Sequence, residues 1–225
     1  MKTVILAGGR GSRLTAVPAG HKAATRFGSR SLLEHAFAEV QELGVAPLCI
    51  VNDTVRDLYE GPAAAASAQL ITTNAENPCA AVKEVVHVGE TVLIVHADEV
   101  CLNSHPALYG VASERFTSPV VGVSSAGFDN ELQLIRRPVA QMRVAAGGRF
   151  PSGGSVAGTE RRYIGRYALT VDDLFRAGLD RCDSVIEAAA HRRPDIIELN
   201  IPKAYFDCGT DEMMKNSRQR LRVLA

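Results

Sequence analysis

The residues whose types and spacing most clearly indicate a chemical role lie near the N-terminus of the chain. A short apolar stretch, Thr3–Ala7, leads directly into a loop with three glycines, Gly8, Gly9 and Gly11. Arg13 lies in the same loop, and the chain has no acidic residue before Glu34. Backbone without Cβ atoms can approach a ligand closely and direct its N–H groups toward it. Since the neighbouring charges are cationic, the loop predicts a site for a polyphosphate.

Spacing separates this loop from the common phosphate-binding motifs. It is not G-x-x-x-x-G-K-[ST], because the next lysine, Lys22, lies well beyond Gly11 and is followed by Ala23. It is not G-x-G-x-x-G either, because Leu14 stands where the last glycine would be. Glycines after a buried strand can also serve a tight strand-to-helix connection. We favour the phosphate role because glycines and unopposed cations coincide.

Two carboxylates follow predicted strands. Asp98 comes after the apolar run TVLIVHA, and Asp207 comes after AYF. Mg²⁺ prefers oxygen ligands and is usually shared with substrate phosphates, so carboxylates near a phosphate loop suit it. Each aspartate alone could simply cap the following turn, and Glu99 could replace or support Asp98. Together with the glycine loop, the two aspartates favour a magnesium site.

The middle of the chain is rich in arginine. Between Glu131 and Arg166 there are seven arginines against two acidic residues. The same stretch contains a polar loop, RFPSGGSVAG, from Arg149 to Gly158. These arginines could bind the phosphate of an acceptor, or they could form a solvated face; both interpretations stay open here.

Apolar stretches and helical periodicity alternate along the first half of the chain. This order predicts a parallel sheet with covering helices, and ligands of such sheets bind at the carboxyl ends of the strands. We expect strands at 3–7, 47–51, 69–72, 91–96, 118–123, 163–169, 196–201 and 204–207, and a hairpin over 131–146. Helices are expected at 31–43, 79–87, 104–115, 171–178 and 211–222.

Bulk composition fits a soluble globular protein. The chain has 225 residues, 46% hydrophobic, with zero formal net charge, which argues against general nucleic-acid binding. No apolar run approaches the ~20 residues that span a bilayer, and no secretory leader is recognisable. The five cysteines show no zinc spacing and suit reduced thiols in the cytoplasm. We therefore expect a cytoplasmic protein that uses neither a membrane nor nucleic acid, and homo-oligomerisation stays open.

Several motifs resemble those of the nucleotidyltransferases that activate sugar 1-phosphates. LAGGRGSRL resembles the N-terminal GG-x-G-x-R-L signature of that family, and Lys22 matches its following lysine. HADE resembles the strand end that carries the family's aspartate, with Ala97 in place of a glycine. FDCGT, before the final helix, is similar to its closing Asp-x-Gly-Thr motif. The similarity runs from residue 1 to about residue 220, so it covers nearly the whole chain.

The resemblance implies a fold and a reaction. The fold is a Rossmann-like three-layer α/β/α nucleotidyltransferase fold with a mainly parallel central sheet, as a single domain over 1–225 with an acceptor-binding or lid region at 128–166. The reaction joins an NTP and a sugar 1-phosphate into an NDP-sugar and pyrophosphate. By the resemblance, the catalytic residues are Arg13 and Lys22, and Mg²⁺ is held by Asp98 and Asp207. The main chain around Leu6, Ala7, Gly8, Gly9 and Gly11 would face the nucleotide. Outside the matched motifs, we expect Glu76 to contact the nucleotide and Arg149, Arg162 and Gly165 to bind the acceptor.

Departures from the family pattern leave other activities open. The mid-chain Glu-Lys-Pro segment is missing, so an arginine such as Arg149, Arg161, Arg162 or Arg166 would have to replace its lysine. The glycine-rich base-reading segment is replaced by residues 74–79, so the base is not readable. One alternative is a cytidylyltransferase-type enzyme for phosphocholine or another small phosphorylated acceptor. Another is a nucleotide-binding regulator without turnover.

Overall fold

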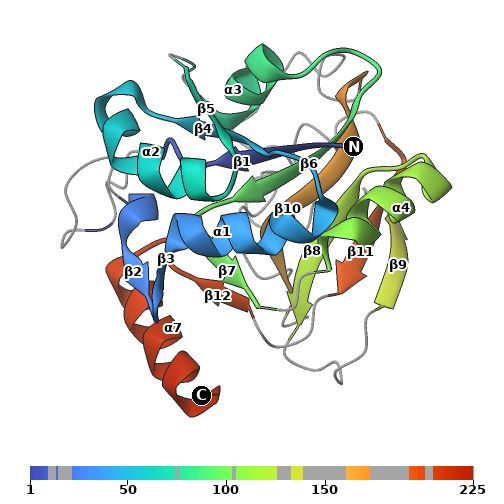
Figure 1. Ribbon diagram of the computed structural model, residues 1–225. Helices are drawn as coiled ribbons and strands as arrows, with labels where there is room; N and C mark the ends of the chain where they lie inside the picture. Colours follow the sequence, from blue (N-terminus) through green and yellow to red (C-terminus); the bar gives the residue numbers. More distant parts are fainter. Residues whose placement is uncertain are drawn as a thin grey trace. The chain divides into compact units, whose positions relative to one another are not determined.

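The computed structural model describes residues 1–9, 14, 22–73, 75, 77–102, 105–125, 133–138, 161–172, 193–200 and 205–224. Eight strands form the main sheet (Figure 1). In spatial order they are β5 (Gln69–Thr72), β4 (Leu48–Val51), β1 (Lys2–Leu6), β6 (Thr91–His96), β10 (Arg161–Thr170), β8 (Val120–Ser125), β11 (Asp195–Asn200) and β9 (Gln133–Pro138). The mostly parallel sheet with helices confirms the predicted nucleotidyltransferase fold class.

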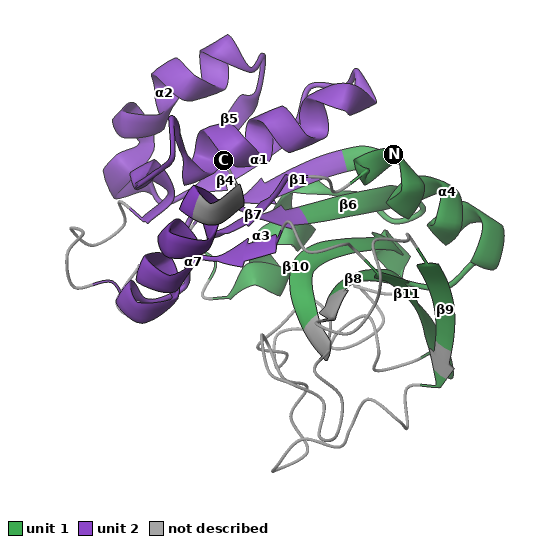
Figure 2. Cartoon of the chain, turned by 90° about the horizontal axis from the view of Figure 1, so that it is seen from below, with its two compact units in different colours: residues 1–2, 75–94, 103–203 green, residues 3–74, 95–102, 204–225 purple. Residues whose placement is uncertain are grey.

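The chain divides into two compact units, each taken here by itself (Figure 2). One unit comprises residues 3–74, 95–102 and 204–225. In it, β1 runs parallel to β4, and β4 runs parallel to β5. Two short antiparallel sheets complete its strands: β2 (Arg26–Phe27) with β3 (Arg30–Ser31), and β7 (Glu99–Cys101) with β12 (Tyr205–Asp207). Its α-helices are α1 (Leu32–Val40), α2 (Arg56–Ala65) and α7 (Asp211–Leu224).

Local sequence explains where α1 begins and ends. Ser31 caps its first turn: the hydroxyl accepts a hydrogen bond from the Glu34 N–H at 3.2 Å, and the Glu34 carboxylate accepts one from the Ser31 N–H at 2.6 Å. This reciprocal capping box satisfies two otherwise unpaired donors. A 3₁₀ turn, Gln41–Leu43, follows α1 and ends at Gly44, whose φ of 64° is left-handed. Both ends of the predicted helix 31–43 are therefore confirmed.

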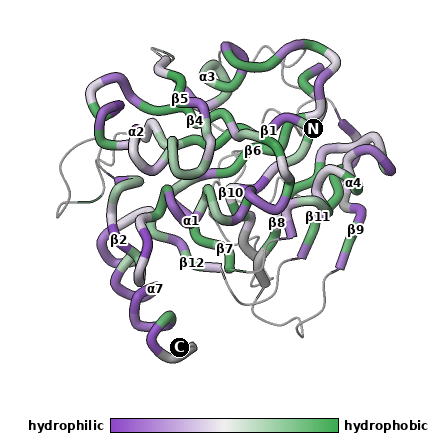
Figure 3. The backbone as a smooth tube through the Cα atoms, in the orientation of Figure 1, coloured by the Kyte–Doolittle hydropathy of each residue, from purple (hydrophilic) through white to green (hydrophobic). Residues whose placement is uncertain are grey.

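Helix α7 packs on the β2–β3 hairpin of the same unit (Figure 1). The Arg218 Nη2 donates to the Arg26 carbonyl at 2.7 Å. Beneath this contact lies an apolar cluster of Phe27, Leu32, Val100, Phe206, Cys208 and Met214, with Leu221 packed against it. In Figure 3, most of α7 has the colour of hydrophilic residues, whereas β4 has the colour of hydrophobic residues. Only the inner stripe of α7 therefore contributes to the core.

The second unit comprises residues 1–2, 75–94 and 103–203. Here β10 is antiparallel to β8, β11 is parallel to β8, and β9 is antiparallel to β11. Its described α-helices are α3 (Pro78–Val85) and α4 (Pro106–Phe116). Close packing between α4, β8 and β10 leaves no room for a side chain at Gly122: a Cβ there would lie 2.5 Å from the Tyr109 hydroxyl and 2.6 Å from Ile164 Cγ1.

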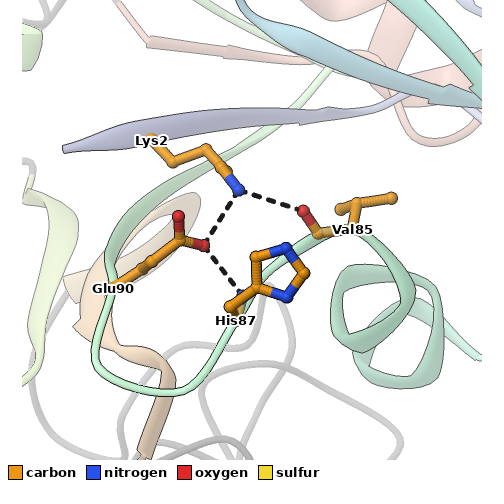
Figure 4. Close-up of polar contacts among 4 residues, drawn as sticks. All are labelled: Lys2, Val85, His87 and Glu90. Atoms are coloured by element: carbon orange, nitrogen blue, oxygen red, sulfur yellow. Dashed lines mark hydrogen bonds and ion pairs between the residues drawn. The ribbon is translucent and has the colours of Figure 1, made fainter.

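Lys2 fastens the start of the chain to this second unit (Figure 4). Its ammonium donates to the Glu90 Oε2 at 2.9 Å and to the Val85 carbonyl at 3.3 Å. The same carboxylate oxygen accepts from the His87 N–H at 2.8 Å. Those two donors, the His87 N–H first, hold the pKa of Glu90 below its usual range.

The predicted elements agree well with the observed ones, with three omissions among the α-helices and strands. Strands 69–72 and 91–96 have the predicted bounds, and the remaining predictions that fall on described residues shift by a few residues at their ends. Helix α2, the β2–β3 hairpin and strand β7 were not predicted. The far part of the predicted hairpin 131–146 and most of the predicted helix 171–178 lie outside the described residues. The single domain over 1–225, with its region 128–166, stays a prediction.

Candidate active site

The carboxyl end of β1 is joined to two neighbouring chain segments. The Ala7 N–H donates to the Ile50 carbonyl of β4 at 2.9 Å, and the Ala97 N–H, just after β6, donates to the Leu6 carbonyl at 3.0 Å. Leu6 and Ala7 therefore lie where β1 ends, beside the segment that continues into Asp98. This is the sheet edge at which a parallel α/β sheet binds its ligands.

The two described loop glycines are not required by packing. Among the described residues, a Cβ at Gly9 would meet no atom within 4 Å, and one at Gly8 would meet Asn52 N and Val51 C at 3.5 Å, an ordinary contact. Neither has the left-handed φ that the structure gives to Gly28, Gly44 and Gly89. Since the protein itself does not need glycine at these positions, the open space suits a ligand close to the backbone.

Lys22 lies in a 3₁₀ turn, Lys22–Ala24, and its residue is only 8% exposed. Its ammonium forms a hydrogen-bonded ion pair with the Asp98 Oδ2. The Thr25 N–H donates to the Lys22 carbonyl at 3.0 Å, which closes the turn and fixes the main chain that carries the lysine. The structure thus brings together two residues that the sequence predicted for different ligands.

Asp98 is ionised because of its neighbours. Burial raises the pKa of its carboxyl, but the charges of Lys22 and His96 and the Lys22 hydrogen bond outweigh burial and leave the pKa below its usual range. The Asp98 carbonyl accepts a hydrogen bond from the Cys208 N–H at 3.1 Å. This bond ties the end of β6 to the turn after β12.

Asp207, at the end of β12, is held from two directions. Its Oδ1 accepts from the Gly209 N–H at 2.7 Å, and its main-chain carbonyl accepts from the Ser217 hydroxyl of α7 at 2.7 Å. A Cβ at Gly209 would lie 2.9 Å from that Oδ1, so a larger residue would displace the carboxylate. Nothing in the sequence singled out Ser217, because its contact depends on how α7 packs.

The two aspartates share a neighbourhood around Cys208. The pKa of the Cys208 thiol is raised to about 12, chiefly by burial and then by the carboxylates of Asp207 and Asp98. Both charges therefore lie close enough to act on one sulfur. Glu99, the alternative considered for Asp98, lies opposite Asp207 in the β7–β12 register.

The donor set fits a magnesium ion that is shared with a substrate. Within the described ranges, no three His, Cys, Asp or Glu side chains form a cluster that could enclose a metal. Two carboxylates with waters and phosphate oxygens are the usual environment of Mg²⁺ in phosphate chemistry. In the structure, the charge of Asp98 is compensated by Lys22.

The predicted acceptor residues lie in the other unit and are only partly described. Gly165 lies on β10, and its carbonyl accepts from Arg166 Nη1 at 3.1 Å. Arg166 is 1% exposed, so this arginine does not belong to a solvated face, whereas the Arg136 side chain is 58% exposed and pairs with Asp195. Arg162 lies opposite Ser124 in the β10–β8 register. Predicted site residues outside the described part of the chain are Gly11, Arg13, Glu76 and Arg149.

Comparison with known proteins shows the family and the fold of the chain. A sequence profile of the MobA-like NTP transferase domain matches residues 3–147. A search of curated protein sequences finds no match to the chain. Among solved structures, a UDP-glucose pyrophosphorylase in complex with UDP-glucose superimposes with a TM-score of 0.67 at 16% identity, covering 100% of this chain and 99% of the other.

Two further solved structures have the same fold. A UDP-glucose pyrophosphorylase from Acinetobacter baumanii gives a TM-score of 0.67 at 15% identity, covering 97% of this chain and 92% of its own. The inositol-1-phosphate CTP transferase from T. maritima gives 0.66 at 15% identity, with 97% and 96% covered. At such low identity, these likenesses concern the fold. None of the helices in the described part of the chain is long and apolar enough to cross a membrane.

Proposed function

Because the chain belongs to the MobA-like NTP transferase domain family, we propose that it joins an NTP to a sugar 1-phosphate, giving an NDP-sugar and pyrophosphate. In this reaction, a phosphate oxygen of the sugar attacks the α-phosphorus in line, and pyrophosphate leaves from the opposite side. The single observation that carries the proposal is the ion pair of Lys22 and Asp98 beside the end of β1. Transfer of this kind depends mainly on positioning and on neutralising oxygen charge.

We assign the work of the site to this chain's residues as follows. The main chain from Leu6 to Gly11 contacts the nucleotide, and Lys22 binds the oxygens around the α-phosphate. Arg13 binds the leaving pyrophosphate. Asp98 and Asp207 hold Mg²⁺, which when bound supplies positive charge to phosphate oxygens. Glu76 is proposed to contact the nucleotide, although residues 74–79 leave the base unspecified.

The acceptor is proposed to be a sugar 1-phosphate bound by the arginine-rich middle of the chain. Arg149, Arg162 and Gly165 are the proposed contacts, in place of the missing mid-chain lysine. The relatives in fold include enzymes named for glucose and inositol phosphates. A polyol phosphate is therefore the second acceptor to test. We also propose a cytoplasmic location, in keeping with the buried, reduced thiols of Cys49, Cys79, Cys101 and Cys208.

A pyrophosphate-release assay tests the proposal. The purified chain is incubated with Mg²⁺ and each NTP in turn, crossed with glucose, mannose and N-acetylglucosamine 1-phosphates, inositol 1-phosphate and phosphocholine. We expect release with one NTP and one sugar 1-phosphate well above all other pairs. Release only with inositol 1-phosphate or phosphocholine would retain the transferase and replace the sugar. NTP binding in a thermal-shift assay, with no release from any pair, would favour the regulator.

A further inference from the structure

The ion pair between Lys22 and Asp98 joins two groups that the proposed function assigns to different ligands. Lys22 is assigned to phosphate and Asp98 to magnesium, yet in the structure each is the other's partner. The Lys22 side chain is 11% exposed and the Asp98 side chain 31% exposed, so neither is freely hydrated. A charge in such surroundings is costly to leave without a partner.

This pairing makes the two ligands interdependent. A metal ion that arrives alone at Asp98 displaces Lys22 and leaves a nearly buried ammonium unpaired. A phosphate that arrives alone at Lys22 leaves the Asp98 carboxylate unpaired. A metal–nucleotide complex supplies a new partner to each group at once: the metal ion pairs with Asp98, and phosphate oxygens pair with Lys22. Both charges therefore stay compensated while the partners are exchanged.

The surrounding structure allows the exchange without moving the main chain. The Asp98 carbonyl is held by the Cys208 N–H at 3.1 Å, and the Lys22 carbonyl by the Thr25 N–H at 3.0 Å. Ala23, next to Lys22, is buried with 3% exposure. The unbranched lysine side chain can turn by rotation about its own bonds. The exchange therefore needs only a change of rotamer at Lys22.

We propose that Lys22 determines specificity for the metal–nucleotide complex: it neutralises Asp98 in the empty enzyme and releases it only when metal and nucleotide bind together. The proposal rests on the proposed function, because it takes Asp98 as a metal ligand. Its consequence is strong positive coupling between metal and NTP. Such coupling is reciprocal, so each ligand raises the affinity for the other by the same factor.

Manganese binding, measured as the loss of free Mn²⁺ by electron paramagnetic resonance, tests this directly. For the unmodified chain we expect weak binding of Mn²⁺ alone and tightening of ~10-fold or more with a saturating NTP, within the usual range of coupling between ligands. Lys22→Met should bind Mn²⁺ alone more tightly than the unmodified chain, because Asp98 is free. The coupling should shrink toward none in that variant.

Controls make the result specific to this pair. Lys2→Met removes a different lysine–carboxylate hydrogen bond, to Glu90, and should leave both affinities unchanged. Asp98→Asn should abolish the tight Mn²⁺ binding, with or without the Lys22 change. If Lys22→Met folds poorly, Lys22→Gln keeps a donor to Asp98 without the charge, and Mg²⁺ alone should raise its melting temperature more than that of the unmodified chain.

The outcomes separate this proposal from the proposed function. Unchanged coupling in Lys22→Met and Lys22→Gln, or no Mn²⁺ binding under any condition, overturns the exchange. If the pyrophosphate-release assay is positive but the Lys22 variants keep the coupling between metal and NTP, the proposed transferase activity is supported and only the exchange at Lys22 is rejected. If metal and NTP binding are coupled as expected but no acceptor gives pyrophosphate release, the exchange at Lys22 is supported and the proposed transferase activity is rejected.

Discussion

Asp207 and Glu99 lie opposite each other across the β7–β12 ladder, so conservative changes can distinguish their roles. Asp207→Asn keeps an oxygen that can accept from the Gly209 N–H but removes the charge. If Asp207 is a metal ligand, we expect turnover to fall by ~10²–10³-fold, the usual cost of losing one charge-stabilising group. The melting temperature should change little. Pyrophosphate release and a thermal melt measure the two effects.

Glu99→Gln is the matched control for this prediction. It keeps the length of the side chain and the strand pairing, and we expect activity close to that of the unmodified chain. Near-normal activity of Asp207→Asn would remove Asp207 from the site. A severe loss confined to Glu99→Gln would assign the metal to Glu99.

Gly9→Ala tests whether the lack of a side chain at Gly9 allows a ligand to approach the backbone. No atom of the residues that the structure describes lies within 4 Å of a Cβ built at Gly9, so we expect the fold to tolerate the methyl group. We expect unchanged or slightly higher stability, since alanine restricts the unfolded chain by ~0.4–1 kcal/mol where its backbone conformation is compatible. NTP affinity should fall by roughly tenfold or more if the backbone there approaches phosphate. Calorimetric titration with NTP would show equal affinity for both proteins if the loop only connects β1 to the next segment.

At the scale of elements, the packing of α4 on β8 and β10 depends on Gly122. In Gly122→Ala the new methyl group would overlap the Tyr109 hydroxyl and Ile164. Overpacking of this kind costs ~1–3 kcal/mol of unfolding free energy. Gly61→Ala in α2 is the control: nothing lies within 4 Å of its Cβ, and alanine in a helix should add up to ~1 kcal/mol. Equal urea midpoints for the two variants would show that α4 can shift at no cost.

Local signals explain which elements could be predicted. Helix α1 carries both its signals in sequence, the capping box at Ser31 and the left-handed Gly44, and it was predicted. Helix α2 was missed because Gly61 and Pro62 lie inside it, and both normally oppose a helix interior. The β2–β3 hairpin was missed because strands of two residues have too little periodicity to recognise.

Some features of the candidate site could likewise be predicted from local sequence, and others could not. The sequence places Asp98 and Asp207 each directly after an apolar strand, and the structure confirms the strands that precede them. The pairing of β7 with β12 and the contact of Lys22 with Asp98 depend on tertiary packing between segments far apart in sequence. Ser217 and its bond to the Asp207 carbonyl likewise gave no sequence signal. The sequence therefore indicated the strand ends that carry the aspartates, whereas the contacts between the charged groups could not be predicted from it, and the roles of these residues stay a prediction.

At the scale of the whole molecule, acid stability should depend on carboxylates with lowered pKa values. The Ser31 N–H lowers the pKa of Glu34, and the His87 N–H and then Lys2 lower that of Glu90 from its ordinary value of 4.5. A lowered pKa contributes stability that is complete above the ordinary value and is lost as the pH falls through the folded value. The urea midpoint should therefore decline as the pH falls below about 4.5.

Glu90→Gln should flatten part of that decline, because the group that takes up the proton is gone. Glu60→Gln is the matched control: Glu60 and Arg56 form an exposed ion pair within α2, with side chains 59% and 42% exposed, and such pairs contribute little. Urea titrations from pH 7 to pH 3 measure all three proteins. Identical pH profiles for the unmodified chain and Glu90→Gln would show that the tie between Lys2 and Glu90 does not contribute to acid stability.

The pairing of β7 with β12 also bears on how the protein is made. A ribosome releases Lys22 and Asp98 early, whereas β12 and the Ser217 contact of α7 come among the last described residues. Domains generally fold as units, and Lys22, Asp98 and residues 204–225 belong to the same compact unit. Until residues 204–225 have been made, β7 lacks its partner strand and the chain lacks Asp207. With the proposed roles, translation itself delays nucleotide turnover until the final helix docks.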